Sequence, residues 1–171
     1  MKLTVLGCGR WGAFLASYHS AKNDVLLWGR PGSKSFSALQ KERKNAYLAL
    51  PSQLRLESEL SAALEFAQVV VISISAQQLR DLARRIARFD LAGKTFILCM
   101  KGIEVQSGKR LTQVFCEEVK QPVGLAVWVG PGHVQDFSAG IPNCMVVDSA
   151  DPATTDFIVE HLSSDLIRLY K

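Results

Sequence analysis

The amino-acid sequence predicts an α/β fold with a doubly wound, mostly parallel sheet. Apolar runs of strand length recur along the 171 residues, and most are continuous rather than alternating. Such runs are typical of strands that are buried on both faces. Patterns of helical period lie between several runs, and strand–helix alternation implies right-handed crossovers. We find no repeat or linker, so a single domain over residues 1–171 is expected.

The expected strands follow one another from the first residues to the last. They are Leu3–Leu6, Val25–Trp28, Val69–Ile74, Thr95–Met100, Leu125–Val129 and Cys144–Val147, with a short final strand in Leu166–Tyr170. The polar, turn-rich segment Pro31–Ser37 is interpreted as a loop.

Helices are predicted where apolar residues recur at spacings of three and four. An apolar helix is predicted after the glycine-rich start of the chain. A second helix is predicted from the apolar stripe Leu79, Leu82, Ala83 and Ile86, and a third from Leu111, Val114, Phe115 and Val119. A last helix has Asp151 as its expected N-cap and Pro152 in its first position, and its apolar stripe is Phe157, Ile158 and Leu162.

Composition excludes several classes of protein. With 48% hydrophobic and 21% charged residues, the chain is neither disordered nor a disulfide miniprotein. The net charge of +4 comes from scattered Lys and Arg, so we expect no nucleic-acid partner. No run approaches the length of a membrane span and no signal peptide follows Lys2, so a cytoplasmic protein is expected.

Neither the cysteines nor the histidines are spaced like metal ligands, so no metal site is expected. Cys8, Cys99 and Cys144 lie in or beside apolar runs. We interpret them as small buried hydrophobic residues in a reducing compartment.

A glycine pattern, Gly7-x-Gly9-x-x-Gly12, lies between the first strand and an apolar helix. In this context Gly7 permits a tight turn, Gly9 lets a pyrophosphate approach the backbone, and Gly12 lets the helix pack close to the strand. The helix N-terminus then directs free N–H groups at the phosphates. This predicts a Rossmann-type dinucleotide-binding domain; a glycine-rich turn without a ligand is the alternative.

The residue at the end of the second strand indicates which dinucleotide binds. An acidic residue there suits the ribose of NAD, whereas an arginine suits the 2′-phosphate of NADP. This chain has Arg30 there, and Asp24 lies at the opposite end of the strand. The cofactor is therefore NADP or NAD, with NADP(H) accepted. The alternative for Arg30 is an ordinary loop arginine in solvent.

Other chemistry-bearing residues follow the later strands. Arg80 lies on the helix after Val69–Ile74, Lys101 follows Thr95–Met100, and the turn Gly130–His133 follows Leu125–Val129. Ligands of open α/β sheets bind beyond the carboxyl ends of the strands. We therefore expect Lys101 and this turn to flank the glycine turn, where a nicotinamide and an anionic substrate could bind. An ordinary exposed lysine is the alternative for Lys101.

Taken together, these segments resemble the NAD(P)-dependent glycerol-3-phosphate dehydrogenases of the bacterial type. The matching motifs run in order over essentially the whole chain: GCGRWG (Gly7–Gly12), LLWGR (Leu26–Arg30), RKNAYL (Arg43–Leu48), KGIE (Lys101–Glu104), Gly130–Pro131 and LIRLY (Leu166–Tyr170). The resemblance implies an N-terminal dinucleotide-binding domain followed by a helical substrate domain. It also implies hydride transfer between NAD(P)H and glycerone phosphate, giving sn-glycerol 3-phosphate for phospholipids.

The resemblance also implies site residues. Gly7, Gly9, Arg10, Trp11, Gly12, Arg30, Lys101 and Val134 would contact the cofactor, and Lys101, Gly130 and Gly132 the substrate.

The chain departs from the family pattern at three places. Ser75 and Ala76 replace the usual proline and serine, and Gly132 replaces a serine or threonine. The helical domain, which carries the family's catalytic lysine, is expected to be absent. We therefore expect no catalytic residue in this chain and no activity from it alone.

Three alternatives remain. The chain could be a non-catalytic dinucleotide-binding or sensor protein derived from the family. It could be a scaffold, associating, for example as a homodimer, through an apolar face near its C-terminal strand. It could also be a dehydrogenase acting on another hydroxy acid, although KGIE and RKNAYL argue against that.

Overall fold

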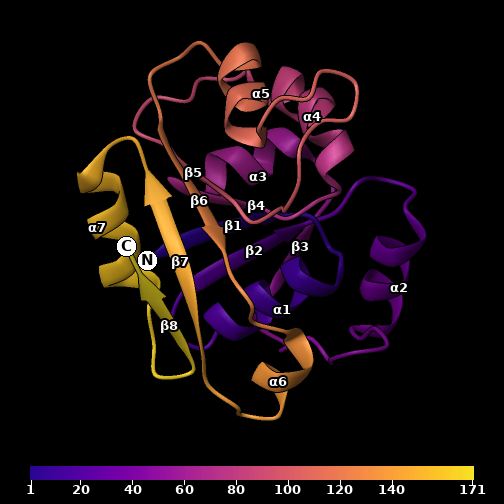
Figure 1. Cartoon of the computed structure of the whole chain (residues 1–171). Coiled ribbons are helices and arrows are strands. Elements are labelled where there is room, and N and C mark those ends of the chain that lie inside the picture. The colour runs from indigo at the N-terminus through magenta and orange to yellow at the C-terminus, as the bar shows by residue number, and fades with distance from the viewer.

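The computed structural model, which describes residues 1–171, is built on one eight-stranded sheet (Figure 1). The spatial strand order is β3-β2-β1-β4-β5-β6-β7-β8. The strands are β1 (Lys2–Leu6), β2 (Asp24–Trp28), β3 (Arg55–Glu57), β4 (Val69–Ile72), β5 (Thr95–Leu98), β6 (Gly124–Val129), β7 (Asn143–Ser149) and β8 (Ile167–Tyr170). All neighbouring strands are parallel except β6 and β7, so the mostly parallel sheet is confirmed.

Helices cover both faces of this sheet. They are α1 (Arg10–His19), α2 (Lys34–Glu42), α3 (Leu60–Phe66), α4 (Leu79–Ile86), α5 (Leu111–Glu118), α6 (Val134–Ser138) and α7 (Pro152–Leu162), with a 3-10 turn at Ala76–Gln78. One core lies beneath α1, α6 and α7, and a second lies beneath α3, α4 and α5. Figure 1 shows these two groups on opposite sides of the central strands. The chain is thus doubly wound.

Successive residues of the central strands supply the two cores in turn. In β5, Ile97 belongs to the core under α1, whereas Phe96 and Leu98 belong to the core under α4 and α5. Adjacent side chains of a strand point to opposite faces, so a strand covered on both faces must be apolar throughout. This explains the continuous apolar runs of the sequence.

The interpretation of Pro31–Ser37 as a loop is partly wrong, because α2 begins at Lys34. The Ser33 hydroxyl caps this helix by accepting from the Phe36 N–H at 3.3 Å. Phe36 and Leu39 are buried and attach α2 to the rest of the domain. The elements β3, α3 and α6 are not predicted from the sequence, because segments of three, seven and five residues are too short to show a clear period.

The interpretation of Cys144 as buried is wrong. Among the helices α7 makes the main contact with β7, and β7 alternates: Met145 and Val147 are buried, while Cys144 and Val146 are exposed. Cys8 and Cys99 are half-buried against the core, and burial raises the pKa of Cys99 to about 12.

The apolar surface expected near the C-terminal strand is narrow. Val146 and its register partner Tyr170 are both exposed there, between the exposed Asp148 and Arg168. None of the helices is both long enough and apolar enough to span a bilayer.

His19, in the last turn of α1, lies in the core against Trp128, with the two rings 5.9 Å apart. Burial lowers the pKa of His19 from 6.5 to about 4, and its Nε2 has no hydrogen-bond partner. The unfolded chain therefore takes up a proton below pH 6.5 that the folded chain does not accept until about pH 4. Stability is lost as the pH falls through this window.

We predict that His19→Leu removes this pH dependence. Between pH 7 and pH 5 the wild-type free energy of unfolding should fall by about 2 kcal/mol more than that of the variant, as the shifted pKa requires. Urea unfolding at the two pH values measures the difference. A control is His161→Leu, because His161 is exposed on α7 and should leave the wild-type pH dependence intact. Equal pH dependence in His19→Leu and wild type would contradict the account.

Candidate functional site

The candidate site lies beyond the carboxyl ends of the parallel strands, around β1 and β4. The chain leaves β1 for β2 and β3 on one side, and returns to form β4, β5 and β6 on the other. The crevice between β1 and β4 is therefore the topological switch point, where open α/β sheets bind ligands. The glycine turn lies at this point, between β1 and α1.

Two of the three glycines are required by packing. Gly7 has φ +120°, and a Cβ there would lie 2.1 Å from the Ser73 carbonyl oxygen at the end of β4. A Cβ on Gly12 would lie 2.0 Å from the Gly7 carbonyl oxygen. A side chain at Gly7 would clash with the segment after β4, and a side chain at Gly12 would push α1 away from the glycine turn.

Gly9 differs from the other two glycines. A Cβ on Gly9 would meet no protein atom within 4 Å, and Gly9 is exposed at the N-cap of α1. No side chain caps this helix and its first turn contains no acidic residue, so its free N–H groups and positive dipole end face open space. The space over Gly9 therefore fits a phosphate or pyrophosphate group.

A pocket of about 480 Å³ opens over this turn. It is lined by the three-residue turn Gly7–Gly9, by Arg10 and Trp11, by Arg30, Ser33 and Ser35 after β2, and by Ser73–Ser75, Asp81 and Arg85 beyond β4. Its three arginines outnumber its one carboxylate, Asp81. The structure therefore brings Arg30 together with the glycine turn in a pocket suited to an anion.

Arg85 is a pocket residue that sequence reasoning missed. It lies on α4, and its guanidinium carbon is 5.7 Å from the centre of the Trp28 ring. The apolar stripe of α4 places Arg85 on the polar side of the helix. The sequence contains no signal that this side faces the end of β2.

The RKNAYL motif builds the loop beside Arg10. Arg43 donates to the Pro51 carbonyl at 2.5 Å and to the Leu54 carbonyl at 2.9 Å, and Asn45 accepts from the Tyr47 N–H at 2.8 Å. This loop holds the Tyr47 hydroxyl 2.7 Å from Nη2 of Arg10, whose guanidinium carbon lies 4.2 Å from the ring centre. Tyr47 was not among the expected site residues, although its motif was identified.

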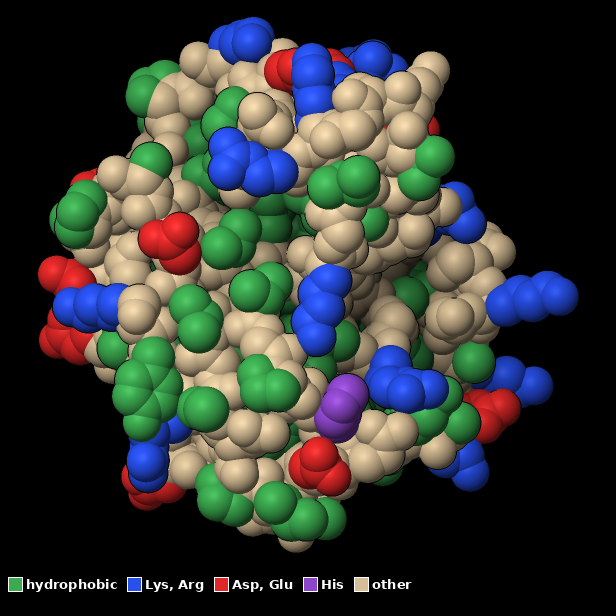
Figure 2. Space-filling model, viewed as in Figure 1, with side chains coloured by type: hydrophobic (Ala, Val, Ile, Leu, Met, Phe, Trp, Pro, Cys, Tyr) green, Lys and Arg blue, Asp and Glu red, His purple; other side chains and the backbone are tan.

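A second hollow, of about 240 Å³, continues from the first and shares Arg10 and Trp11 with it. It is lined by Cys99, Lys101, Trp128–Gly130, Gly132–Gln135 and Met145. The structure thus brings Lys101 and the turn 130–133 beside the glycine turn. Figure 2 shows a hollow near the centre of this face, with Lys or Arg side chains and a histidine around it.

The two glycines of the 130–133 turn are fixed by their neighbours. A Cβ on Gly132 would lie 2.5 Å from the Phe137 ring, and one on Gly130 would lie 2.9 Å from the Met145 Cα. The ring of Phe137 therefore fills the position where a serine or threonine side chain would start. Val134 is buried at the start of α6 and lines the same hollow.

A third hollow, of about 1520 Å³, is a groove between α5 and β6. Lys101 and Gly130 line it as well as the second hollow, and Asp148–Asp151 also line it. It does not include the glycine turn. We assign the dinucleotide site to the smaller pocket at the glycine turn, because that pocket contains the uncapped N-terminus of α1 and three arginines.

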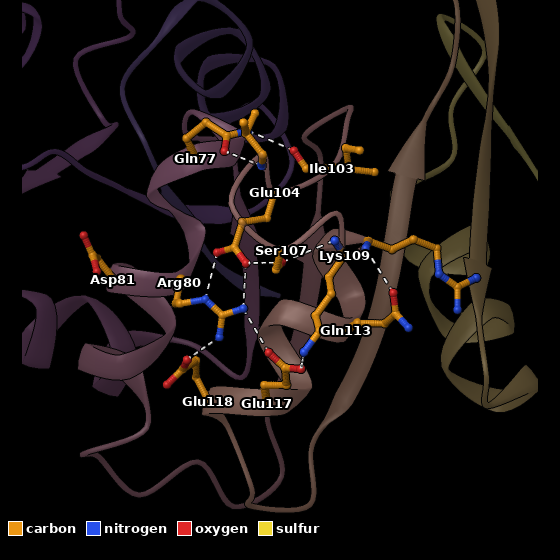
Figure 3. Close-up of polar contacts among 12 residues, drawn as sticks. Gln77, Arg80, Asp81, Ile103, Glu104, Ser107, Lys109, Gln113, Glu117 and Glu118 are labelled. Atoms are coloured by element: carbon orange, nitrogen blue, oxygen red, sulfur yellow. Dashed lines mark hydrogen bonds and ion pairs between the residues drawn. The ribbon is translucent and has the colours of Figure 1, made fainter.

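Arg80 does not line either of the hollows at the glycine turn. It binds three carboxylates instead: Glu104 in the loop after β5, and Glu117 and Glu118 on α5 (Figure 3). The hydrogen bonds from Arg80 and then from Ser107 lower the pKa of Glu104 to about 2, and Arg80 in turn has a raised pKa. This network ties the KGIE loop to two helices.

No three His, Cys, Asp or Glu side chains gather where they could hold a metal ion. Every residue expected to contact cofactor or substrate lines one of the two hollows at the glycine turn, except Gly12, which is buried against the Gly7 carbonyl.

Comparison with known proteins agrees with this geometry. The family model for the N-terminus of NAD-dependent glycerol-3-phosphate dehydrogenase matches residues 2–155. A glycerol-3-phosphate dehydrogenase (NAD(P)+) of Pelodictyon phaeoclathratiforme is 34% identical over 99% of this chain, and one of Thiobacillus denitrificans is 32% identical. The chain covers 53% and 52% of these proteins, so it spans about half the length of these relatives.

Solved structures show the same fold. The crystal structure of glycerol-3-phosphate dehydrogenase from Coxiella burnetii superposes with a TM-score of 0.89 at 25% identity, over 99% of this chain and 53% of that one. A glycerol-3-phosphate dehydrogenase structure from Plasmodium falciparum gives a TM-score of 0.85 at 14% identity, over 99% and 52%. The chain therefore belongs to the NAD-dependent glycerol-3-phosphate dehydrogenase family and corresponds to its N-terminal domain.

Proposed function

We propose that this chain binds NADP(H) or NAD(H) at the glycine turn and is the cofactor-binding part of a glycerol-3-phosphate dehydrogenase. The observation that carries this proposal is the open space over Gly9. Packing forbids a side chain at Gly7 and Gly12, but nothing in the protein forbids one at Gly9. The absence of a side chain at Gly9 is explained by a ligand that approaches the backbone.

The two hollows, which share Arg10 and Trp11, suggest which way the two halves of the dinucleotide extend from the glycine turn. The pyrophosphate would bind at the N-terminus of α1, beside Arg10. The adenosine half would extend toward Arg30, Ser33 and Arg85. The nicotinamide half would extend into the second hollow, toward Lys101 and the turn at Gly130.

The substrate would bind next to the nicotinamide. A bound nicotinamide supplies the hydride in reduction of glycerone phosphate and accepts it in the reverse reaction. The exposed Lys101 ammonium would attract the anionic substrate and orient it over the second hollow, with Gly130 and Gly132 giving backbone access. We assign no proton-transfer group among these 171 residues, so we expect binding without turnover.

The homodimer, which the sequence analysis gives as one alternative, and the cytoplasmic location stay predictions. The exposed pair Val146 and Tyr170 supports a modest association surface at the edge of the sheet. The mass of the protein in solution tests the dimer.

We predict that Gly9→Ala separates binding from folding. The backbone at Gly9 (φ −70°) accepts an alanine, and the added methyl meets no protein atom. Unfolding in urea should match wild type, while the Kd for NADPH should rise at least about tenfold because the methyl blocks the pyrophosphate. Trp11 and Trp28 line the pocket, so tryptophan fluorescence measures binding.

Gly12→Ala is the matched control for this experiment. Its Cβ would overlap the Gly7 carbonyl, so this variant should lose stability. If Gly9→Ala binds NADPH as tightly as wild type, the pyrophosphate does not lie over Gly9.

We further predict that Arg30 and Arg85 set the preference between cofactors. Both line the adenosine end of the pocket, and a guanidinium there pairs with the 2′-phosphate that only NADP(H) carries. Arg30→Ala and Arg85→Ala should each weaken NADPH binding by about tenfold and change NADH binding little. The exposed Arg88, which lines none of these hollows, is the control. An unchanged ratio of the two Kd values in Arg30→Ala would refute the assignment.

A further inference from the structure

We propose that Glu104 is a positioning residue that acts through Lys101. Together with Arg80 and Gln77 it clamps the loop 101–110 to the segment after β4, and so fixes Lys101 at the rim of the cleft. The inference rests on the proposed function, in which Lys101 contacts cofactor and substrate. It assigns a role to the one charged residue of the KGIE motif that lines no hollow.

Glu104 is the only acidic residue in the buried set, with 7% of its surface exposed. A buried carboxylate is unfavourable unless it is paired and hydrogen-bonded. Arg80 meets this need with two bonds: Nε to Oε1 at 2.8 Å and Nη2 to Oε2 at 2.7 Å. The Ser107 hydroxyl donates to the same carboxylate. This bidentate geometry fixes the direction as well as the position of Glu104.

Gln77 holds the backbone on either side of Glu104. Its Nε2 donates to the Ile103 carbonyl at 2.9 Å, and its Oε1 accepts from the Val105 N–H at 2.9 Å. Figure 3 shows the amide of Gln77 and the guanidinium of Arg80 reaching this stretch from the same side. Three consecutive loop residues are therefore attached to one neighbouring segment, by side chain and by backbone.

The loop also closes on itself around Glu104. The Glu104 N–H donates to the Lys109 carbonyl at 2.9 Å, and the Gly108 N–H donates to the Glu104 carbonyl at 2.8 Å. An isolated bridge joins Ile103 to Arg110. Glu104 thus bonds to Lys109 and Gly108 within the loop through its backbone, and to Arg80 on α4 through its side chain.

Arg80 is itself held in place by α5. It donates to Glu117 at 2.9 Å and to Glu118, which Arg84 also contacts at 3.1 Å. Lys109 pairs with Glu117 from the loop side. The clamp therefore joins the loop to both α4 and α5.

Lys101 has no hydrogen bond or ion pair of its own in the structure. Its place at the rim is therefore set by the backbone on either side. On one side β5 ends at Leu98. On the other is Gly102, with φ +107°, followed at once by the clamped residues. Releasing the clamp leaves Gly102 free to change conformation, and Lys101 moves with it.

The test is a double-mutant cycle on the 171-residue chain with NADPH as the probe. The variants are Lys101→Ala, Glu104→Gln and the double mutant. We expect Glu104→Gln to weaken NADPH binding about as much as Lys101→Ala does, with no further loss in the double mutant. Hydrogen exchange of the Glu104 and Gly108 amides should speed up in Glu104→Gln.

Glu118→Gln is the matched control, because it removes another carboxylate from the same Arg80 but leaves the loop contacts intact. Its Kd and loop exchange should change far less than those of Glu104→Gln, because Glu117 and both Glu104 oxygens still bind Arg80. Equal effects of Glu118→Gln and Glu104→Gln would overturn the proposal in favour of a purely structural network. Additive effects of Lys101→Ala and Glu104→Gln would also overturn it, as would wild-type exchange and binding in Glu104→Gln.

The cycle also distinguishes failure of the proposed function. If wild type does not bind NADPH, or if Lys101→Ala binds it normally, the role given to Lys101 is wrong. The proposal that Glu104 positions Lys101 for the cofactor is then wrong as well. Hydrogen exchange of the Glu104 and Gly108 amides still shows whether Glu104 orders the loop.

Discussion

The end of β1, the first turn of α1 and the end of β4 can meet only because Gly7 and Gly12 have no side chains. The Gly7 position lies against the Ser73 carbonyl, and the Gly12 position lies against the Gly7 carbonyl. This contact draws the helix N-terminus into the crevice where the strand order reverses. Gly9 then lies at the crevice with open space above it, and the first N–H groups of α1 have no side-chain cap.

The rest of the site is assembled around this contact by electrostatics and packing. The Tyr47 hydroxyl accepts a hydrogen bond from Arg10. The segment after β2 supplies Arg30, α4 supplies Arg85, and the loop after β5 supplies Lys101. Of the carboxylates near this loop, Glu104, Glu117 and Glu118 are all engaged by Arg80. They therefore do not face the hollows, and the crevice remains suited to anions. The same ion pairs that neutralise the acids also order the loop that carries Lys101.

The fold was largely predictable from the sequence, because strands covered on both faces leave continuous apolar runs. The glycine turn was predictable too, since its spacing lies within one strand–turn–helix unit. Arg85, Tyr47 and the role of Glu104 were not, because each depends on which distant segments become neighbours. Cys144 was placed wrongly for a related reason: one face of β7 is exposed, which a short apolar run does not reveal. The motif RKNAYL was visible, but the loop it builds required the structure.

The most direct test of this account is a titration of the ¹⁵N-labelled chain with NADPH, followed by amide chemical shifts. We predict saturable shifts that are largest at Gly9, Arg10 and Trp11, with smaller shifts around Lys101. A well-dispersed spectrum of a folded chain that NADPH leaves unchanged would contradict the central claim that the space over Gly9 holds a dinucleotide.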